Sequence, residues 1–123
     1  MTINEAIEII DQLKPNTYTT DEKLRWLSNL DGKIKEEIID THEGGEDVVF
    51  EGYTGTVNMD AELLVKAPHD DIYIKWLEAQ MDYANGEMRK YNNSITAFND
   101  EYTAFRNSYN RRHMPKGRNF SHF

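Results

Sequence analysis

The sequence contains no cysteine and no long hydrophobic run. Because none of its 123 residues is a cysteine, the chain can form neither a disulfide framework nor a thiolate metal site. The absence of cysteine is typical of proteins from reducing compartments. No apolar run approaches the roughly 20 residues that span a bilayer. The opening Met1–Glu5 also lacks the basic and then apolar order of a signal peptide. We therefore expect a soluble protein that is made in the cytoplasm and has no membrane partner.

Sequence motifs of common enzyme classes are also missing. The chain has no GxSxG, P-loop or GxGxxG pattern, although Gly44-Gly45 and the pair Gly52 and Gly55 are locally rich in glycine. Carboxylates are plentiful, but most fall on helix faces that we expect to be solvated. None has an apolar sequence context that would raise its pKa for acid–base catalysis. We predict a protein that is not an enzyme and that needs no cofactor.

Charge is spread unevenly along a chain whose net charge is −8. The segment from Arg111 to Phe123 holds four basic side chains and no acidic one, so the other 110 residues carry 10 Lys or Arg against 22 Asp or Glu. An acidic body opposes binding of nucleic acid. The basic C-terminal segment instead suits an acidic neighbour or a phosphate backbone.

The second half of the chain carries a continuous stripe of large side chains at helical spacing. Steps of three and four residues alternate along it, which keeps the stripe on one face of an α-helix. Since its members are hydrophobes and tyrosines, we interpret it as a surface that packs against another protein or within the core, rather than as a site that stacks nucleotides. The stripe consists of Ile74, Leu77, Met81, Ala84, Met88, Tyr91, Ile95, Phe98, Tyr102, Phe105 and Tyr109.

Capping signals place four helices. Thr2 and Glu5 form a capping box for a helix that ends at Leu13, and Thr20 opens a second helix that runs to about Thr41. A third helix begins after Pro68. The stripe then continues to Arg111, and two models compete for it: one unbroken helix over 70–111, about 60 Å long, or two helices separated at Asn92-Asn93-Ser94. We favour the break, because such a long helix exceeds the width of a small domain.

The segment 46–68 separates the second and third helices. Its β-prone runs, Val48-Val49-Phe50 and Leu63-Leu64-Val65, are divided by glycines, so we expect a long loop or a small β-hairpin. The predicted fold class is therefore mainly all-α, with four helices in a single domain over 1–112. Residues 113–123 follow as a flexible basic tail.

One group of residues suggests a metal. His69-Asp70-Asp71, together with His42 and Glu43, is the best set of candidate ligands, and a metal-dependent hydrolase is the corresponding hypothesis. Metal sites on helices commonly place two His at i and i+4, a spacing that this chain lacks. We therefore interpret Asp70 and Asp71 as residues that cap the third helix, and we predict no metal site.

Several strings resemble a known family of proteins. They are similar to small proteins encoded among the structural genes of tailed phages and prophages of Gram-positive bacteria, in the head–tail connector or head-completion adaptor class. The similarity covers most of the chain, but it consists of packing patterns without a catalytic signature. The strings are Leu24 to Ile34, Asp71 to Tyr83, Tyr91-Asn92-Asn93-Ser94, Phe98-Asn99-Asp100-Glu101-Tyr102 and Tyr109-Asn110-Arg111-Arg112-His113-Met114-Pro115.

The resemblance implies a structural subunit that forms a ring, commonly of twelve copies, beneath the portal. Its partners are then further copies of itself, the portal protein and a head-closure or tail protein, while DNA passes through the channel without specific binding. The protein is expected in the virion, and in the host cytoplasm during assembly. Another small helical adaptor that binds one phage or host partner is the alternative. We expect the interface to include Phe50, Tyr53, Arg111, Arg112, Lys116, Arg118, Phe120 and Phe123.

Overall fold

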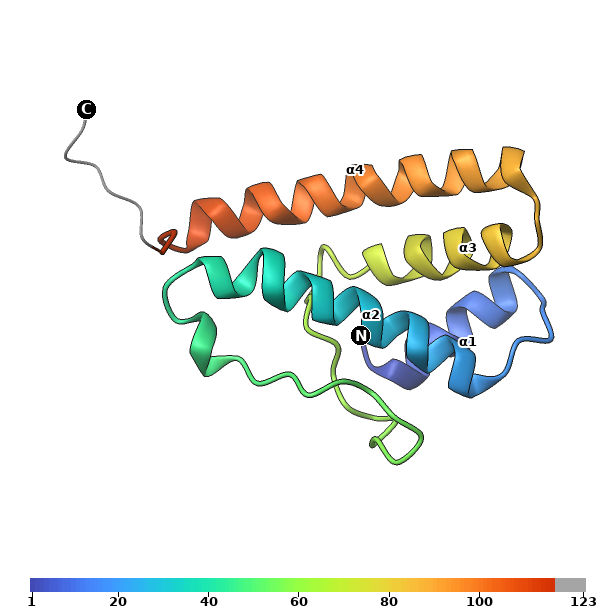
Figure 1. The fold of residues 1–123 in the computed structure, drawn as a ribbon, viewed down its shortest axis with the longest axis horizontal. Coiled ribbons are helices and arrows are strands. Elements are labelled where there is room, and N and C mark those ends of the chain that lie inside the picture. The colour runs from blue at the N-terminus through green and yellow to red at the C-terminus, as the bar shows by residue number, and fades with distance from the viewer. Residues whose placement is uncertain (117–123) are drawn as a thin grey trace.

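Within residues 1–116, four α-helices and two short 3₁₀ helices make up the fold, as the all-α prediction expects (Figure 1). The computed structural model describes residues 1–116, so the expected interface residues Arg118, Phe120 and Phe123 lie outside the described residues. The elements in chain order are α1 (Ile3–Leu13), α2 (Thr20–Glu37), η1 (Ile39–Thr41), η2 (Gly45–Asp47), α3 (Ile72–Ala84) and α4 (Met88–Arg112).

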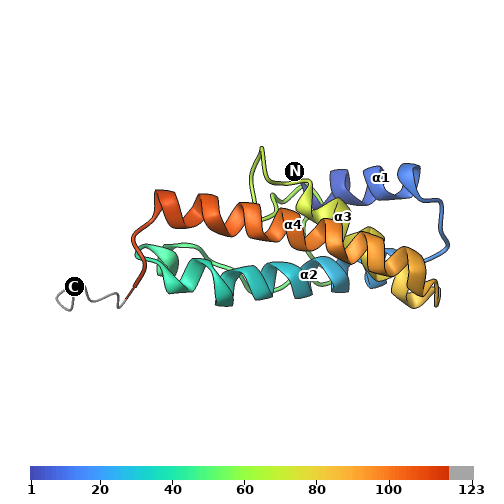
Figure 2. The same cartoon turned by 90° about the horizontal axis from the view of Figure 1, so that it is seen from above.

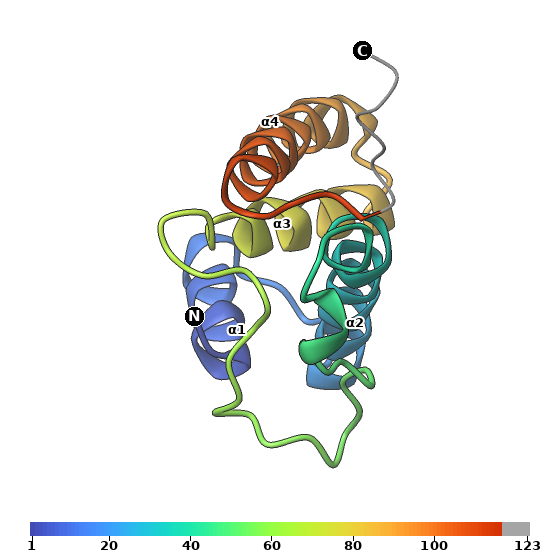
Figure 3. The same ribbon diagram turned by 90° about the vertical axis from the view of Figure 1, so that its left-hand side faces the viewer.

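Helix α3 is the centre of the molecule. It packs against α1 and α2 on one side and against α4 on the other, and Figures 2 and 3 show α4 lying over α3 with α1 and α2 beneath. Ile72, Tyr73, Leu77 and Met81 of α3 are all 0% exposed. This arrangement explains why α3 is more apolar than α2 and α4, since a helix covered on several faces needs apolar residues around most of its circumference.

The starts of the first two helices follow the capping signals closely. The Thr2 hydroxyl accepts a hydrogen bond from the Glu5 backbone N–H (3.1 Å), and Glu5 Oε1 accepts one from the Thr2 N–H (2.9 Å), so the predicted capping box is confirmed. Helix α2 begins at Thr20, as predicted, and its N-cap is Thr19, whose hydroxyl accepts a hydrogen bond from the Glu22 N–H. The α-helix ends at Glu37, and η1 continues the chain to Thr41.

The break between the last two helices is real, but we predicted it at the wrong place. It lies at Asn85-Gly86-Glu87, where Gly86 has a φ of 75°, and Asn92 and Asn93 are exposed residues inside α4. A left-handed φ is accessible to glycine at little cost. The turn folds α4 back along α3, so the ring centroids of Trp76 and Phe98 lie 4.9 Å apart.

The hydrophobic stripe therefore packs mainly within its own chain, which favours the core interpretation over packing against another protein. Phe98, Tyr102 and Phe105 of α4 are at most 7% exposed and join the same core as α3. Only the part of the stripe at the turn is open to solvent, where Met88 is 49% exposed and Ala84 is exposed. A helical hairpin buries such a stripe against itself.

The segment between η2 and α3 is an irregular loop, with no strand within residues 1–116. Its second half pairs with the N-terminus instead of with Val48-Val49-Phe50, since Leu63 N–H donates to the Met1 carbonyl (3.0 Å) and Ile3 N–H donates to the Ala61 carbonyl (3.1 Å). Leu63 and Val65 are fully buried. The loop is thus fixed to the core at its C-terminal end.

The position of the break can be tested by substitution. Gly86→Ala should lower the free energy of unfolding by about 1–2 kcal/mol, because alanine at this φ brings its Cβ too close to the following carbonyl oxygen. The double substitution Asn92→Ala with Asn93→Ala should leave stability unchanged or raise it by up to about 1 kcal/mol, since alanine is the better helix former. Urea unfolding followed by circular dichroism measures both. A larger loss in the double variant than in Gly86→Ala would place the turn at the asparagines.

Candidate interaction surface

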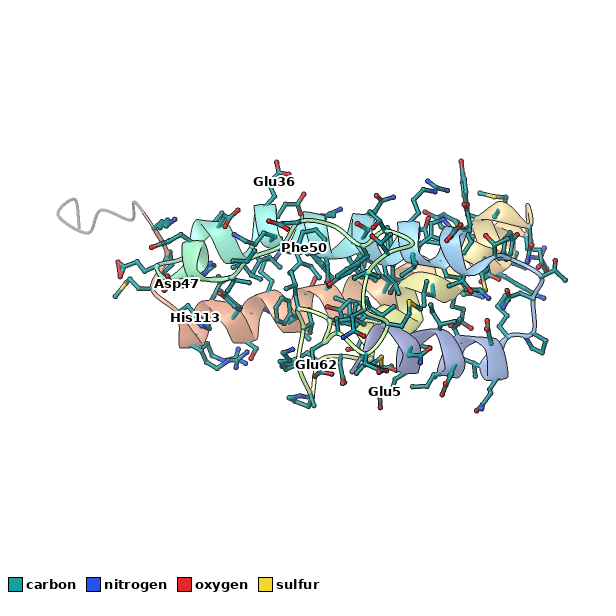
Figure 4. All side chains as sticks on the ribbon, turned by 90° about the horizontal axis from the view of Figure 1, so that it is seen from below. Glu5, Glu36, Asp47, Phe50, Glu62 and His113 are labelled. Atoms are coloured by element: carbon teal, nitrogen blue, oxygen red, sulfur yellow. The ribbon has the colours of Figure 1, made fainter. Side chains whose placement is uncertain are left out.

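Two of the expected interface residues, Phe50 and Tyr53, come from the irregular loop and are partly buried by their own chain. Phe50 lies over α2 beside Gly32, and its ring contacts the Tyr53 ring edge-on at a centroid distance of 5.0 Å (Figure 4). The Tyr53 hydroxyl donates a hydrogen bond to Asp31. The structure therefore gives both residues a role in fixing the loop to α2.

Asp31 is the centre of a buried polar cluster that the sequence interpretation missed. It is 0% exposed. Its Oδ1 accepts a hydrogen bond from the Tyr73 hydroxyl (2.6 Å), and its Oδ2 accepts from Tyr53 and from the Leu64 N–H (3.1 Å). Tyr73 in turn accepts from the Val65 N–H (2.7 Å). The cluster joins α2, α3 and both halves of the loop.

The pKa values in this cluster reflect burial first. Burial raises the pKa of Asp31, and the three donated hydrogen bonds partly oppose that rise. Burial and the adjacent Asp31 charge raise the pKa of Tyr73, and the same two causes raise the pKa of Tyr53. Because every hydrogen-bond contact to Asp31 is a donor, the carboxylate form satisfies all of them. Since Asp31 is fully buried and its oxygens accept three hydrogen bonds from the chain itself, we assign the cluster a structural role.

The C-terminal end of α4 is fixed to η1 and η2. His42 is 4% exposed, and its two ring nitrogens lie 2.6 Å from the Ile38 carbonyl oxygen and 2.7 Å from Asn110 Oδ1. Beyond the helix, Glu43 N–H donates to the Met114 carbonyl (2.7 Å), and Lys116 N–H donates to the Thr41 carbonyl (2.6 Å). Lys116 Nζ also lies 3.1 Å from Glu46 of its own chain. The expected tail therefore begins as an anchored segment.

The arginines of α4 form no ion pair with a carboxylate among the described residues. Within residues 1–116, Arg25 pairs with Glu22, whereas Arg89, Arg106, Arg111 and Arg112 form no ion pair. Arg106 instead lies over the Tyr102 ring, with its guanidinium carbon 5.5 Å from the ring centroid. Both expected interface residues Arg111 and Arg112 are exposed. Their charges are thus available to a partner.

The charge boundary falls at the start of α4 rather than at Arg111. Residues 88–116 carry six Lys or Arg and two Asp or Glu, a balance of +4, whereas residues 1–87 carry seven and 20, a balance of −13. The extreme is the range 36–62, which has nine acidic side chains and no lysine or arginine. The sequence shows this asymmetry only once the helix boundary at Met88 is known.

These opposite charges lie mainly on opposite sides of the molecule and meet at the C-terminal end of α4, where Lys116 pairs with Glu46. In Figures 1 and 3, α4 runs along one long edge and the loop that follows η2 runs along the other, with α3 between them. Figure 4 views the loop side, where Glu5, Glu36, Asp47 and Glu62 surround Phe50. The molecule thus presents an acidic side and a side on which basic residues outnumber acidic ones, and these two sides are electrostatically complementary.

A second buried carboxylate connects the other end of the bundle. Asp82 is 2% exposed, and its Oδ2 accepts a hydrogen bond from Ser94 Oγ (2.7 Å). Lys14 Nζ lies 2.6 Å from Oδ1, off the direction of a hydrogen bond, so this contact is an ion pair and Oδ1 has no hydrogen-bond donor in the described structure. The three side chains come from α3, α4 and the end of α1, and we interpret them as a structural link.

The candidate metal ligands do not gather. In the part of the chain that the structure describes, no group of three or more His, Asp or Glu is placed to hold a metal ion. Both His42 nitrogens have hydrogen-bond partners, and Asp70 Oδ2 lies 3.5 Å from the N-terminal ammonium. Asp71 occupies the N-cap position of α3, as predicted, but its side chain makes no capping hydrogen bond.

None of the helices in residues 1–116 combines the length and apolar character that a membrane crossing requires. Comparisons of the chain with protein-family models, with curated proteins and with solved structures find no match.

Proposed function

We propose that this protein is a structural phage protein, a head–tail connector subunit that forms a ring between the portal and the tail-side proteins. The sequence strings that resemble this family suggest the proposal. The observation that carries it is the opposition of charge across the subunit, with an acidic loop side facing away from α4. In this role the protein performs no catalysis and needs no cofactor.

Opposed charge favours assembly of identical copies. When the α4 side of one copy meets the loop side of the next, each contact joins two different surfaces, which is a heterologous interface. Such an interface repeats from copy to copy and closes into a ring when the rotation between neighbours allows it. Arg111 and Arg112, which form no ion pair within residues 1–116, then lie next to carboxylates of the neighbouring copy.

The proposal also assigns the remaining partners. The portal protein and a head-closure or tail protein bind the two faces of the ring, first in the host cytoplasm and later in the virion. Acidic side chains outside the subunit contacts face the channel, where they repel the phosphates of passing DNA and so prevent specific binding.

Salt dependence of the particle mass tests the ring. We expect closed particles of several copies at an ionic strength of about 0.1 M and dissociation toward the monomer at about 1 M, because the Debye length falls from about 10 Å to about 3 Å. Native mass spectrometry and sedimentation measure the mass. A protein that stays monomeric at both salt concentrations, with portal protein added or not, would favour the alternative of a small helical adaptor.

A genetic measurement tests the place in assembly. A phage that lacks this gene should accumulate filled heads and separate tails, and the intact gene supplied in trans should restore infectious particles. Normal yields of tailed particles without the gene would contradict the connector role. Stoichiometric binding of a transition metal by the purified protein would instead favour the hydrolase hypothesis.

A further inference from the structure

A small cavity lies where the C-terminal part of α4 passes η1 and the chain that precedes α3. Its volume is about 130 Å³. This is below the range of about 300–1,000 Å³ for ordinary ligand pockets, so the cavity suits a single side chain. Its apolar lining includes the buried Phe105 together with Tyr109 and Leu64, and its exposed or half-exposed lining includes Lys66, Arg112 and His113.

The charge of this cavity is unusual for the chain. Three basic residues line it and no carboxylate does, although the protein has a net charge of −8. Arg112 and His113 form no ion pair within residues 1–116, and their side chains contact backbone carbonyls of α4 instead. Lys66 forms an ion pair with Glu62 at 3.7 Å, and both side chains are more than half exposed. An apolar side chain flanked by carboxylates therefore matches both the lining and the charge.

The acidic side of the same chain carries such a group. Val49 is 75% exposed, the largest exposed fraction among the large hydrophobic residues described. Asp47 and Glu51 flank it, and both are exposed without an ion pair in the described structure. Glu46 is already paired with Lys116. Residues 47–51 thus present the exposed side chain of Val49 between the carboxylates of Asp47 and Glu51.

We propose that the cavity beside Arg112 receives Val49 of a second copy of this chain, with Asp47 and Glu51 of that copy lying next to Arg112 and Lys66. The choice of a second copy rests on the proposed ring. Burial of the valine removes apolar surface from water. The charge pairs fix the orientation of residues 47–51 at the cavity. They also increase the rate at which the two copies associate.

The test uses full-length variants with matched controls. Arg112→Glu and Val49→Ser should each weaken self-association about tenfold or more at low salt, because a buried apolar contact or a close charge pair is lost. Arg89→Glu makes the same charge change at the other end of α4, and Leu13→Ser alters another exposed apolar residue, 58% exposed, so both should associate like the wild type. Combining Arg112→Glu with Asp47→Arg in one chain should restore association.

A peptide of residues 44–52 provides a second measurement that does not depend on a ring. It should shift the NMR signals of Phe105, Tyr109 and His113 saturably, and Arg112→Glu should abolish these shifts while Arg89→Glu keeps them. If the chain forms rings but the peptide gives no such shifts and Arg112→Glu associates normally, the inference is overturned while the proposed function stands. If the peptide binds at the cavity but the particle is a dimer, the result supports the inference and contradicts the proposed ring. Absence of both association and peptide binding would refute the inference.

Discussion

Replacement of Asp31 by alanine is expected to lower the free energy of unfolding by about 3–5 kcal/mol, because it leaves buried donors without an acceptor. The carboxylate accepts hydrogen bonds from Tyr73, Tyr53 and the Leu64 N–H, and Asp31 itself is 0% exposed. A loss of this size is a large part of the stability of an ordinary domain, about 5–15 kcal/mol. Urea unfolding followed by circular dichroism measures it.

The matched control for this prediction is Asp100→Ala. Asp100 is exposed in the middle of α4 and forms no ion pair in the described residues, so its removal should change stability by no more than about 0.5 kcal/mol. Asp31→Asn should fall between the two, because the amide keeps one acceptor oxygen but presents an N–H₂ group to donors. The loop should also become more sensitive to protease in Asp31→Ala. Equal stability of Asp31→Ala and Asp100→Ala would show that the cluster contributes little.

The helices were predictable because their signals are local. Thr2 and Glu5 are three residues apart, and the stripe residues that mark α3 and α4 repeat within single turns. The turn was harder, since the three–four rhythm continues across Gly86 without a change. Three poor helix formers at Asn92-Asn93-Ser94 gave the stronger local signal for a break, yet tertiary packing against α3 keeps them helical.

The partner of the hydrophobic stripe could not be predicted from its spacing. A stripe that faces the other half of its own hairpin has the same period as one that faces another protein. The turn at Gly86 decides between these cases by bringing Trp76 and Phe98 together. The surface that remains for partners therefore combines charges such as Arg111 and Arg112 with a few apolar groups, among them Val49 and the stripe residues that line the cavity beside Arg112.

One signal for the buried carboxylate was present in the sequence. Asp31 lies four residues after Leu27 and three before Ile34, so it belongs to the buried face of α2. The sequence does not show which hydrogen-bond donors stabilise the buried carboxylate. Tyr73 is 42 residues away along the chain, and only the packing of α3 against α2 brings its hydroxyl to the carboxylate. Long-range contacts of this kind have no local pattern.

Tyrosines that cannot ionise in the folded state should make the protein unfold at alkaline pH. Burial and the neighbouring Asp31 charge raise the pKa of Tyr73 well above the ordinary value of about 10. Above pH 10 the unfolded chain loses this proton and the folded chain keeps it, so the folded state binds more protons and its stability falls as pH rises. Tyr73 alone contributes a loss of about 1.4 kcal/mol per pH unit. Tyr53 has its pKa raised by the same causes and adds to this loss.

Urea unfolding at a series of pH values from about 8 to 12 measures this loss, and phenolate absorbance reports ionisation of the tyrosines. We expect a nearly flat free energy of unfolding up to about pH 9.5 and a decline beyond it, with the phenolate signal of Tyr73 appearing only as the helices unfold. Tyr73→Phe removes the ionisable group, so its stability should be lower at pH 7, where the hydrogen bond to Asp31 is lost, but should decline less steeply above pH 10. Tyr83, 60% exposed on the same helix, is the matched control, and Tyr83→Phe should leave the slope unchanged. If Tyr73→Phe declines as steeply as the wild type, the tyrosine at Asp31 is not the source of the alkaline loss.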